Sequence, residues 1–169
     1  HVLRIPGNGT EAYINRRVEA VAARAAARAA VSPEVIATTD DGLMLTAAIE
    51  NAATMTPDSF NANPAAVARA GAALAALHRS GEKFDFRFEL FSMIDDYLKI
   101  LKAKNCPVPD GYPQALASAE DVRRALNARA LPLVACHCDP LSENFLDTGE
   151  RMWIVDWEYS GMNDPIWDV

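Results

Sequence analysis

The chain has 169 residues, of which 50% are hydrophobic and 23% are charged, values typical of a globular protein that buries a core of its own. Its net charge of −7 argues against a general attraction to nucleic acid or to an anionic membrane. Three cysteines, an odd number, argue against a disulfide framework and predict a cytoplasmic location.

A strand, a turn and a long helix are predicted at the start of the chain. Residues 2–5 are apolar except for Arg4, and residues 6–9 (Pro-Gly-Asn-Gly) have the composition of a turn. Thr10 is of a residue type that caps helices, so a helix is predicted over residues 11–30.

The apolar residues of this helix are predicted to form one stripe, with Glu19 beside it. Spacings of 4, 3 and 4 place the following residues on one face: Ile14, Val18, Val21 and Ala25. The alanine-rich part of the helix contains Arg24 and Arg28, so it predicts neither a membrane span nor membrane insertion.

A hairpin and a second helix follow. Residues 35–38 and 43–46 flank an Asp-Asp-Gly turn and predict two paired strands. Asn63 and Pro64 predict the start of a helix that runs to about residue 80. The predicted buried stripe of this helix consists of Val67, Ala70, Leu74 and Leu77. His78 lies beside that stripe, and we expect it to be a packed or capping residue.

Helices are predicted to predominate up to the next strand. Helical spacing after residue 88 predicts a helix that ends near Lys104, with the apolar residues Phe91, Ile94, Leu98 and Leu101. Residues 106–111 predict a loop. Ser118 and Asp121 resemble a capping box, so another helix is predicted from there to about residue 130.

Residues 137–144 carry the strongest chemical signal in the chain. They read His-Cys-Asp-Pro-Leu-Ser-Glu-Asn and follow a predicted buried strand at residues 133–136. Asn144 lies five residues after Asp139, so one loop presents a carboxylate and an amide. A short predicted hairpin then leads to Asp156, whose carboxylate can face the same point.

These residue types fit phosphoryl transfer from a nucleotide. One carboxylate accepts the proton of an attacking hydroxyl, while a second carboxylate and an amide hold the metal ions that neutralise the phosphates. Mg²⁺ is the predicted metal because it is a hard ion that prefers oxygen ligands. The spacing H-x-D-x(4)-N, followed by an Asp after an apolar run, is that of the catalytic loop of kinases.

Other interpretations of this region stay open. The acidic residues can be solvated turn residues in a polar loop between two strands. A separate alternative is an unrelated helical regulatory domain, in which the match to the loop is chance. Cys136 and Cys138 flank His137 and suggest a metal cluster, although the chain has no second Cys/His pair to complete four ligands. A non-catalytic nucleotide-binding domain would keep the loop without turnover. We expect His137 itself to be structural and to pack inward.

The motifs together resemble the choline/ethanolamine kinase family, within the aminoglycoside-phosphotransferase-like kinases. The resemblance rests on residues 137–144, on Ile-Val-Asp-Trp-Glu-Tyr-Ser-Gly at 154–161, and on Asn-Asp-Pro-Ile-Trp-Asp at 163–168. It implies an α+β, protein-kinase-like two-lobe fold. Residues 1–50 would form a partial N-lobe with an antiparallel sheet, and residues 51–169 a helical C-lobe with the catalytic hairpin. Because the chain opens inside a strand-like run without Met, we expect a fragment of a longer protein.

The resemblance also implies the roles of individual residues. Asp139 is the expected catalytic base, and Asn144 and Asp156 are the expected ligands of Mg²⁺. Arg4 takes the place of the lysine that pairs with the phosphates of ATP, and Glu19 is expected to pair with Arg4 and orient it. The backbone that hydrogen-bonds adenine is expected at Ala47, Ala48 and Ile49.

The acceptor implied by the resemblance is choline, ethanolamine or a similar small amino alcohol. Glu158 is expected to meet this cationic acceptor or to help bind metal. Thiamine, aminoglycoside and sugar kinases share much of the pattern and stay alternatives. A quaternary ammonium needs an aromatic cage. The resemblance implies that this cage lies largely beyond Val169, and we expect Trp157, Tyr159 and Trp167 to pack. No nucleic-acid partner is expected.

Overall fold

The computed structural model describes residues 1–7, 9–10, 13–129 and 132–169. These residues fall into two compact units, one made of His1–Arg87 with Leu133–Val169 and the other of Phe88–Pro132. We call them unit 1 and unit 2 and describe each by itself. The predicted lobe boundary at residue 50 is a different division of the chain and stays a prediction.

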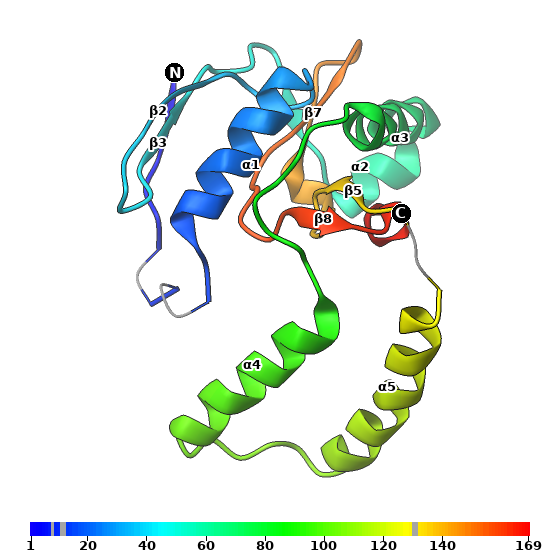
Figure 1. Cartoon of the computed structure of the whole chain (residues 1–169). Helices are drawn as coiled ribbons and strands as arrows, with labels where there is room; N and C mark the ends of the chain where they lie inside the picture. The colour runs from blue at the N-terminus through cyan, green and yellow to red at the C-terminus, as the bar shows by residue number, and fades with distance from the viewer. Residues whose placement is uncertain (8, 11–12, 130–131) are drawn as a thin grey trace. The chain divides into compact units, whose positions relative to one another are not determined.

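The N-terminal part of unit 1 is a three-stranded antiparallel sheet that lies alongside helix α1 (Figure 1). Its strand order is β1 (Val2–Arg4), β3 (Met44–Thr46) and β2 (Val35–Thr38). Arg4 is paired with Met44, which fixes the position of its side chain at the end of the first strand. The predicted strand and hairpin are both confirmed.

Helix α1 (Arg16–Arg28) begins later than the sequence predicts. Its N-cap is Asn15, whose side-chain oxygen accepts from the backbone N–H groups of Arg17 and Val18, so the cap predicted at Thr10 is wrong. Residues 11 and 12, where the helix was expected to begin, lie outside the described residues. Alanines form most of the buried face of the helix, namely Ala22, Ala23, Ala25 and Ala26.

The remainder of unit 1 is built from short strands and two helices. Strands β4 (Ala53–Thr54), β6 (Phe145–Asp147) and β7 (Met152–Ile154) form a second antiparallel sheet, in the order β4-β6-β7. Strand β5 (Val134–Cys136) pairs with β8 (Gly161–Asn163). The helices are α2 (Pro57–Ala62) and α3 (Pro64–Arg79), and the 3₁₀ turns are η1 (Ser142–Asn144) and η2 (Pro165–Asp168).

Helix α3 supplies much of the core of unit 1. The predicted start at Pro64 and the Asn63 cap are confirmed, and Leu77 is fully buried. The buried face contains Ala66, Ala70, Ala73, Leu74 and Leu77. Val67 was expected in this stripe but is 52% exposed, because it lies one residue, or about 100°, beyond Ala66 around the helix.

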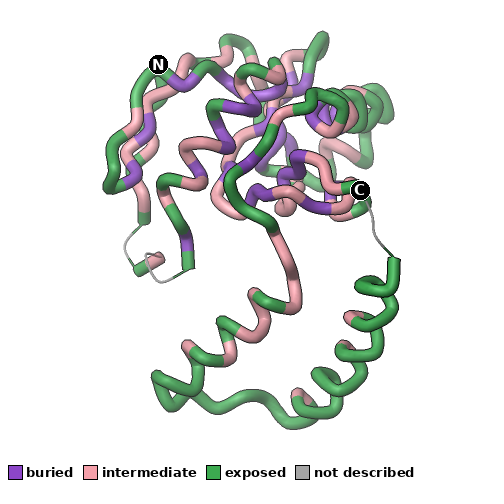
Figure 2. Tube along the Cα trace, in the orientation of Figure 1, coloured by how far each residue is buried: buried purple, intermediate pink, exposed green. Residues whose placement is uncertain are grey.

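Unit 2 consists of helix α4 (Leu90–Ala103) and helix α5 (Tyr112–Asn127). Neither helix contains a buried residue, as Figure 2 shows by the absence of buried positions along both. Arg123 joins the two helices by donating to Asp95 and by lying over the ring of Phe91. The capping box predicted at Ser118 is wrong, since this residue lies inside α5 and its hydroxyl donates to the carbonyl of Gln114. Residue 130, its predicted end, is not among the described residues.

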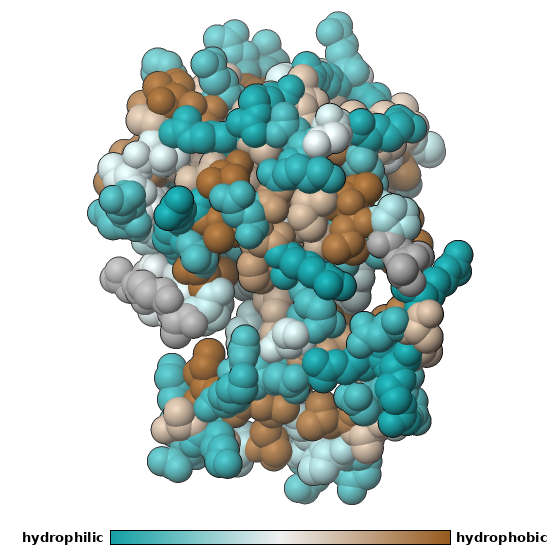
Figure 3. Space-filling model, in the orientation of Figure 1, coloured by the Kyte–Doolittle hydropathy of each residue, from teal (hydrophilic) through white to brown (hydrophobic). Residues whose placement is uncertain are grey.

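One face of the molecule is shown by residue hydropathy in Figure 3. Figure 3 shows hydrophilic residues over most of the visible face, with hydrophobic residues in small separate groups between them. Among the described residues, none of the helices combines the length and the apolar character needed to cross a bilayer.

We expect Leu77→Ala to lower the free energy of unfolding by about 2–5 kcal/mol, because it leaves a cavity where α3 meets the core. Val67→Ala, on the exposed side of the same helix, should change it by no more than about 0.5 kcal/mol. Urea denaturation of both variants measures the difference. Equal losses would show that α3 does not bury the face described here.

Candidate active site

Residues 137–144, which we call the catalytic loop, connect β5 to β6 through the turn η1. His137 is fully buried, and its Nε2 donates to the carbonyl of Val155 at 2.9 Å. Its ring packs edge-on against Trp157, with 4.8 Å between the ring centroids. The prediction that His137 is structural is therefore confirmed.

Asn144 ties the catalytic loop together. Its side-chain Nδ2 donates to the backbone carbonyl of Asp139 at 2.9 Å. The backbone carbonyl of Asn144 accepts from the backbone N–H of Val155, also at 2.9 Å. Val155 directly precedes Asp156 in the chain. These two hydrogen bonds hold the predicted base and both predicted metal ligands in one small region.

Two residues at this site have a left-handed backbone, which is uncommon outside glycine. Cys138, directly before Asp139, has φ 66°, and Asp156 has φ 67°. Such conformations cost free energy and persist only where the surrounding structure fixes them, and they concentrate at functional sites. The sequence carries no local signal for either one, since neither residue is glycine.

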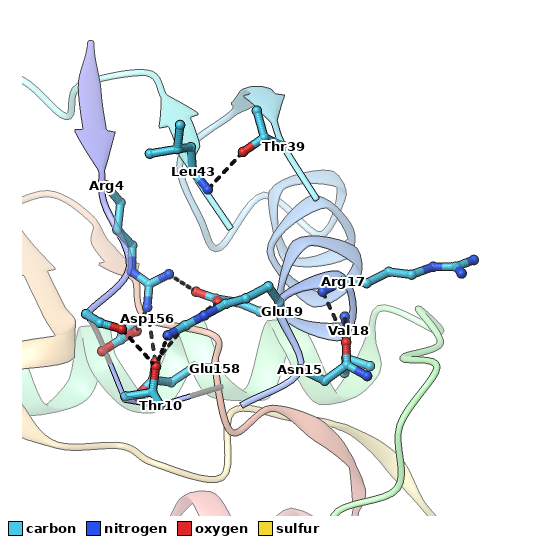
Figure 4. A network of polar contacts seen from close by, with 12 residues as sticks. Arg4, Thr10, Asn15, Arg17, Val18, Glu19, Thr39, Leu43, Asp156 and Glu158 are labelled. Atoms are coloured by element: carbon cyan, nitrogen blue, oxygen red, sulfur yellow. Dashed lines mark hydrogen bonds and ion pairs between the residues drawn. The ribbon is translucent and has the colours of Figure 1, made fainter. Parts of the chain in front are cut away.

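A cluster of charged side chains gathers beside the catalytic loop (Figure 4). Arg4 forms an ion pair with the buried carboxylate of Glu19, as the sequence analysis expects. The Nη2 of Arg4 also donates to Asp156 at 3.3 Å and to Glu158 at 3.1 Å. One guanidinium group therefore contacts three carboxylates from distant parts of the chain.

Arg16 is a member of this cluster that sequence reasoning missed. Its Nη1 donates to Glu19 at 2.9 Å and to Glu158 at 3.2 Å. The available signal was its position one helical turn before Glu19, where side chains three residues apart meet. The cluster then holds three carboxylates against two guanidinium groups and keeps one net negative charge.

Burial shapes the protonation of two of these carboxyl groups. Burial raises the pKa of Glu19, while the hydrogen bond from Arg16 and the charge of Arg4 oppose that rise. Burial also raises the pKa of Asp139, and the neighbouring carboxylates of Asp156 and Glu158 add to the rise while His137 opposes it. A raised pKa makes Asp139 a stronger proton acceptor than an ordinary aspartate.

A cavity of about 450 Å³ adjoins this cluster within unit 1. Apolar side chains of the N-terminal sheet and of α1 form one part of its wall, namely Val2, Ala23, Val35 and Met44. Arg4, Asn144 and Asp156 line it with polar groups. The cavity thus joins an apolar wall to a charged end.

The predicted hinge residues lie partly along this cavity. Ala47 and Ile49 line it. Ala48 is exposed and is not among the lining residues, so its expected backbone contact with adenine stays a prediction. Glu19 and Glu158 do not line the cavity either, but both contact Arg4, which does.

The donor set fits Mg²⁺ at the charged end of the cavity. Asp156 offers a carboxylate and Asn144 an amide oxygen, both hard ligands. The carboxylate oxygens of Glu19, Asp156 and Glu158 also lie within 4.8 Å of one another, but these groups already pair with Arg4 or Arg16. The residues present therefore match the metal that the sequence analysis predicts.

The cysteines beside His137 do not suit a metal cluster. The thiol of Cys136 is buried and donates to the carbonyl of Asn163 at 3.5 Å, and burial raises its pKa. Burial also raises the pKa of Cys138, to about 12. Among the described residues, no group of three possible metal ligands includes both Cys136 and Cys138. All three cysteines of the chain are free.

Comparisons with known proteins show the family to which the chain belongs. A family model described as "Phosphotransferase enzyme family" matches residues 2–169. Protein LicA of Haemophilus influenzae is 31% identical over 99% of this chain, which spans 63% of that protein. A choline/ethanolamine kinase family protein from Mesorhizobium loti is 61% identical, with a TM-score of 0.86, over 98% of this chain and 55% of that one.

The choline kinase LicA from Streptococcus pneumoniae is 25% identical, with a TM-score of 0.84, over 98% of this chain and 58% of that one. A structure of LicA in complex with AMP has a TM-score of 0.82 at the same identity. The expected α+β, protein-kinase-like fold and the expected resemblance to choline/ethanolamine kinases are confirmed. The chain spans little more than half of the length of the matched structures. It belongs to the phosphotransferase enzyme family.

Proposed function

We propose that the protein to which this chain belongs transfers the γ-phosphoryl group of ATP to the hydroxyl of choline or a related amino alcohol. The observation that carries the proposal is the cavity, where Arg4, Asn144 and Asp156 converge beside an apolar wall. An apolar wall suits a flat base, and a cation with metal ligands suits phosphates. The LicA complex with AMP supports a nucleotide as the ligand.

Asp139 is the proposed base for the acceptor hydroxyl. Its backbone is held by Asn144, and burial raises its pKa. An alcohol is a far weaker acid than any carboxylic acid, so the main contribution of Asp139 is to orient the hydroxyl and to take its proton as the new bond forms.

Asn144 and Asp156 are the proposed Mg²⁺ ligands. Bound there, Mg²⁺ would neutralise charge on the phosphates during transfer. Glu19 holds one edge of the Arg4 guanidinium through their ion pair, which leaves the other edge directed at Asp156 and the phosphate end of the cavity. Phosphates that bind here would compete with Asp156 and Glu158 for this edge of Arg4.

The amino-alcohol acceptor is supported by charge and by similarity. The net negative charge of the cluster favours a cationic acceptor over a neutral sugar. The 61% identical structure is described as a choline/ethanolamine kinase family protein. Glu158 accepts hydrogen bonds from Arg4 and Arg16, so a direct contact with the acceptor would require it to share its carboxylate. We also propose that the protein is located in the cytoplasm.

The full-length protein should phosphorylate choline or ethanolamine when ATP and Mg²⁺ are present. Phosphorus NMR of reactions with choline, ethanolamine, thiamine and an aminoglycoside identifies the product. Chelation of Mg²⁺ should stop transfer, and readdition should restore it. Turnover of thiamine or the aminoglycoside alone would contradict the proposed acceptor, and nucleotide binding without any product would make the protein non-catalytic.

Asp139→Asn should lower kcat by about 10²-fold or more, the usual scale for losing a positioned proton acceptor. The same change should raise the melting temperature at neutral pH. A carboxyl group whose pKa is raised by folding destabilises the folded state when ionised, and Asn carries no charge. This gain should shrink as the pH falls through the raised pKa, where the wild-type carboxyl is protonated.

Enzyme kinetics measures the change in kcat, and calorimetry measures the change in melting temperature. A variant that is both inactive and less stable would point to unfolding rather than to the loss of a base. A kcat near that of the wild type would remove Asp139 from its proposed role.

Arg4 and Glu19 should act as one unit in ATP use. Removing either side chain should lose most of the kcat/KM that removing both loses, because the remaining partner is left without its ion pair. Arg4→Lys should cost less than Arg4→Ala, since it keeps the charge but loses the planar fork. A double-mutant cycle on kcat/KM for ATP measures the coupling.

Arg28 and Glu82 provide the matched control for this cycle. They form another ion pair that starts from α1, but Arg28 is exposed and neither residue lines the cavity. Replacing both with Ala should leave kcat/KM unchanged. Effects of Arg4→Ala and Glu19→Ala that add within about 0.5 kcal/mol would show that the pair does not cooperate.

A further inference from the structure

The side chain of Arg16 is held at several points along its length. Arg16 is the first residue of α1, and its side chain is only 10% exposed, against 31% for that of Arg4. Its stem packs against the turn between β2 and β3, where a Cβ atom added to Gly42 would lie 2.8 Å from Cγ and Cδ of Arg16. Its Nη2 donates to the hydroxyl of Thr10. The guanidinium group of Arg16 is therefore fixed in place, and it does not line the cavity.

Arg16 and Arg4 bind the same two carboxylates. Glu19 pairs with Arg4 through Oε1 and with Arg16 through Oε2, the latter at 2.9 Å. Oε2 of Glu158 accepts from both guanidinium groups, at 3.1 Å from Arg4 and at 3.2 Å from Arg16. When Arg4 leaves Glu158, this carboxylate consequently keeps a cation as its partner.

The stability of α1 does not explain a cation at this position. The N-terminal end of a helix carries a partial positive charge, which disfavours Arg there and favours an acidic residue such as Glu19. Two carboxylates offset this cost for Arg16, one from α1 itself and one from the segment after β7. The position of Arg16 therefore indicates a task in the charged cluster.

Nucleotide binding creates a need for a second cation. Arg4 is the member of the pair that lines the cavity, so phosphates bound there would compete with the carboxylates for it. If Arg4 were their only partner, Glu158 and the nearly buried Glu19 would lose part of their pairing, and a buried carboxylate without a partner is costly. A cation that stays in place reduces this cost.

We propose that Arg16 is a positioning residue that keeps Glu19 and Glu158 paired while Arg4 binds the phosphates of the nucleotide. The proposal rests on the proposed function, in which Arg4 receives these phosphates. Because Arg16 does not line the cavity, its effect on nucleotide binding passes through the two carboxylates.

The test measures the Kd for ATP of the full-length protein by titration calorimetry, with a chelator in place of Mg²⁺. Without metal or acceptor, any contact of Glu158 with either one does not enter the measurement. Arg17→Ala is the matched control, because it removes the same charge from the next residue of α1. Arg17 is exposed, and its side chain points away from the charged cluster (Figure 4).

Arg16→Ala should raise the Kd for ATP by about tenfold, a usual size for the coupling between two sites. Arg16→Lys should cost less, since it keeps the charge but loses the planar fork. Arg17→Ala should change the Kd by no more than about twofold, as expected for a screened surface charge. An unchanged Kd for Arg16→Ala, or equal losses for Arg16→Ala and Arg17→Ala, would overturn the proposal.

Glu158→Gln provides the background that separates this role from a structural one. The side chain at position 158 then needs no cation, so Arg16→Ala should raise the Kd by no more than about threefold in this background. A role in folding alone predicts a lower melting temperature for Arg16→Ala and the same ratio of Kd values in both backgrounds. That result would also overturn the proposal.

Arg16→Gln takes the place of Arg16→Ala if the latter does not fold. Gln keeps part of the stem and an N–H donor but carries no charge, so the same loss of about tenfold is expected. A wild type that binds ATP but phosphorylates no acceptor would contradict the proposed function and leave this comparison valid. A wild type that binds no ATP would contradict both.

Discussion

The site depends on the ion pairs that the guanidinium group of Arg4 forms with three carboxylates. This group joins the first strand to helix α1 through Glu19 and to the segment after β7 through Asp156 and Glu158. These segments are far apart in the sequence. Because Glu19 is nearly fully buried, its charge requires a partner, and Arg4 with Arg16 supplies it. The charged cluster therefore holds the sheet, the helix and the segment after β7 together.

The packing around this cluster follows from residue size. The buried face of α1 consists mainly of alanines, whose small side chains let the helix lie close to the N-terminal sheet. Close approach brings Glu19 within reach of Arg4 in the first strand. The same alanines contribute little apolar area each, so the larger core residues, such as Leu77 and Ile154, come from α3 and β7. The site thus lies where a tightly packed helix meets a larger core.

Features that depend on residues close together in the sequence could be predicted, and features that depend on contacts between segments far apart in the sequence could not. The loop with Asp139 and Asn144 and the strand before Asp156 follow from local spacing. The pairing of Arg4 with Glu19 needed a known family as a guide. Asp168 belongs to a motif of the resemblance, but the hydrogen bonds that it accepts from the N–H groups of His137 and Cys138 could not be predicted, because backbone amides about thirty residues earlier leave no trace in residue type. The predicted cap at Thr10 is wrong because Asn15, of a residue type that caps helices equally well, directly precedes the first helical residue, Arg16.

Strand β8 has only three residues, but the chain segments directly before and directly after unit 2 both pair with it. The carbonyl of Phe86 accepts from the N–H of Met162, Arg87 forms a bridge with Met162, and Val134 pairs with Asn163. The chain therefore leaves unit 1 and returns to it at neighbouring points of one strand. A loop whose ends are already fixed costs little more free energy when it is lengthened. The helices between these points can consequently change in length and sequence while the catalytic loop keeps its place.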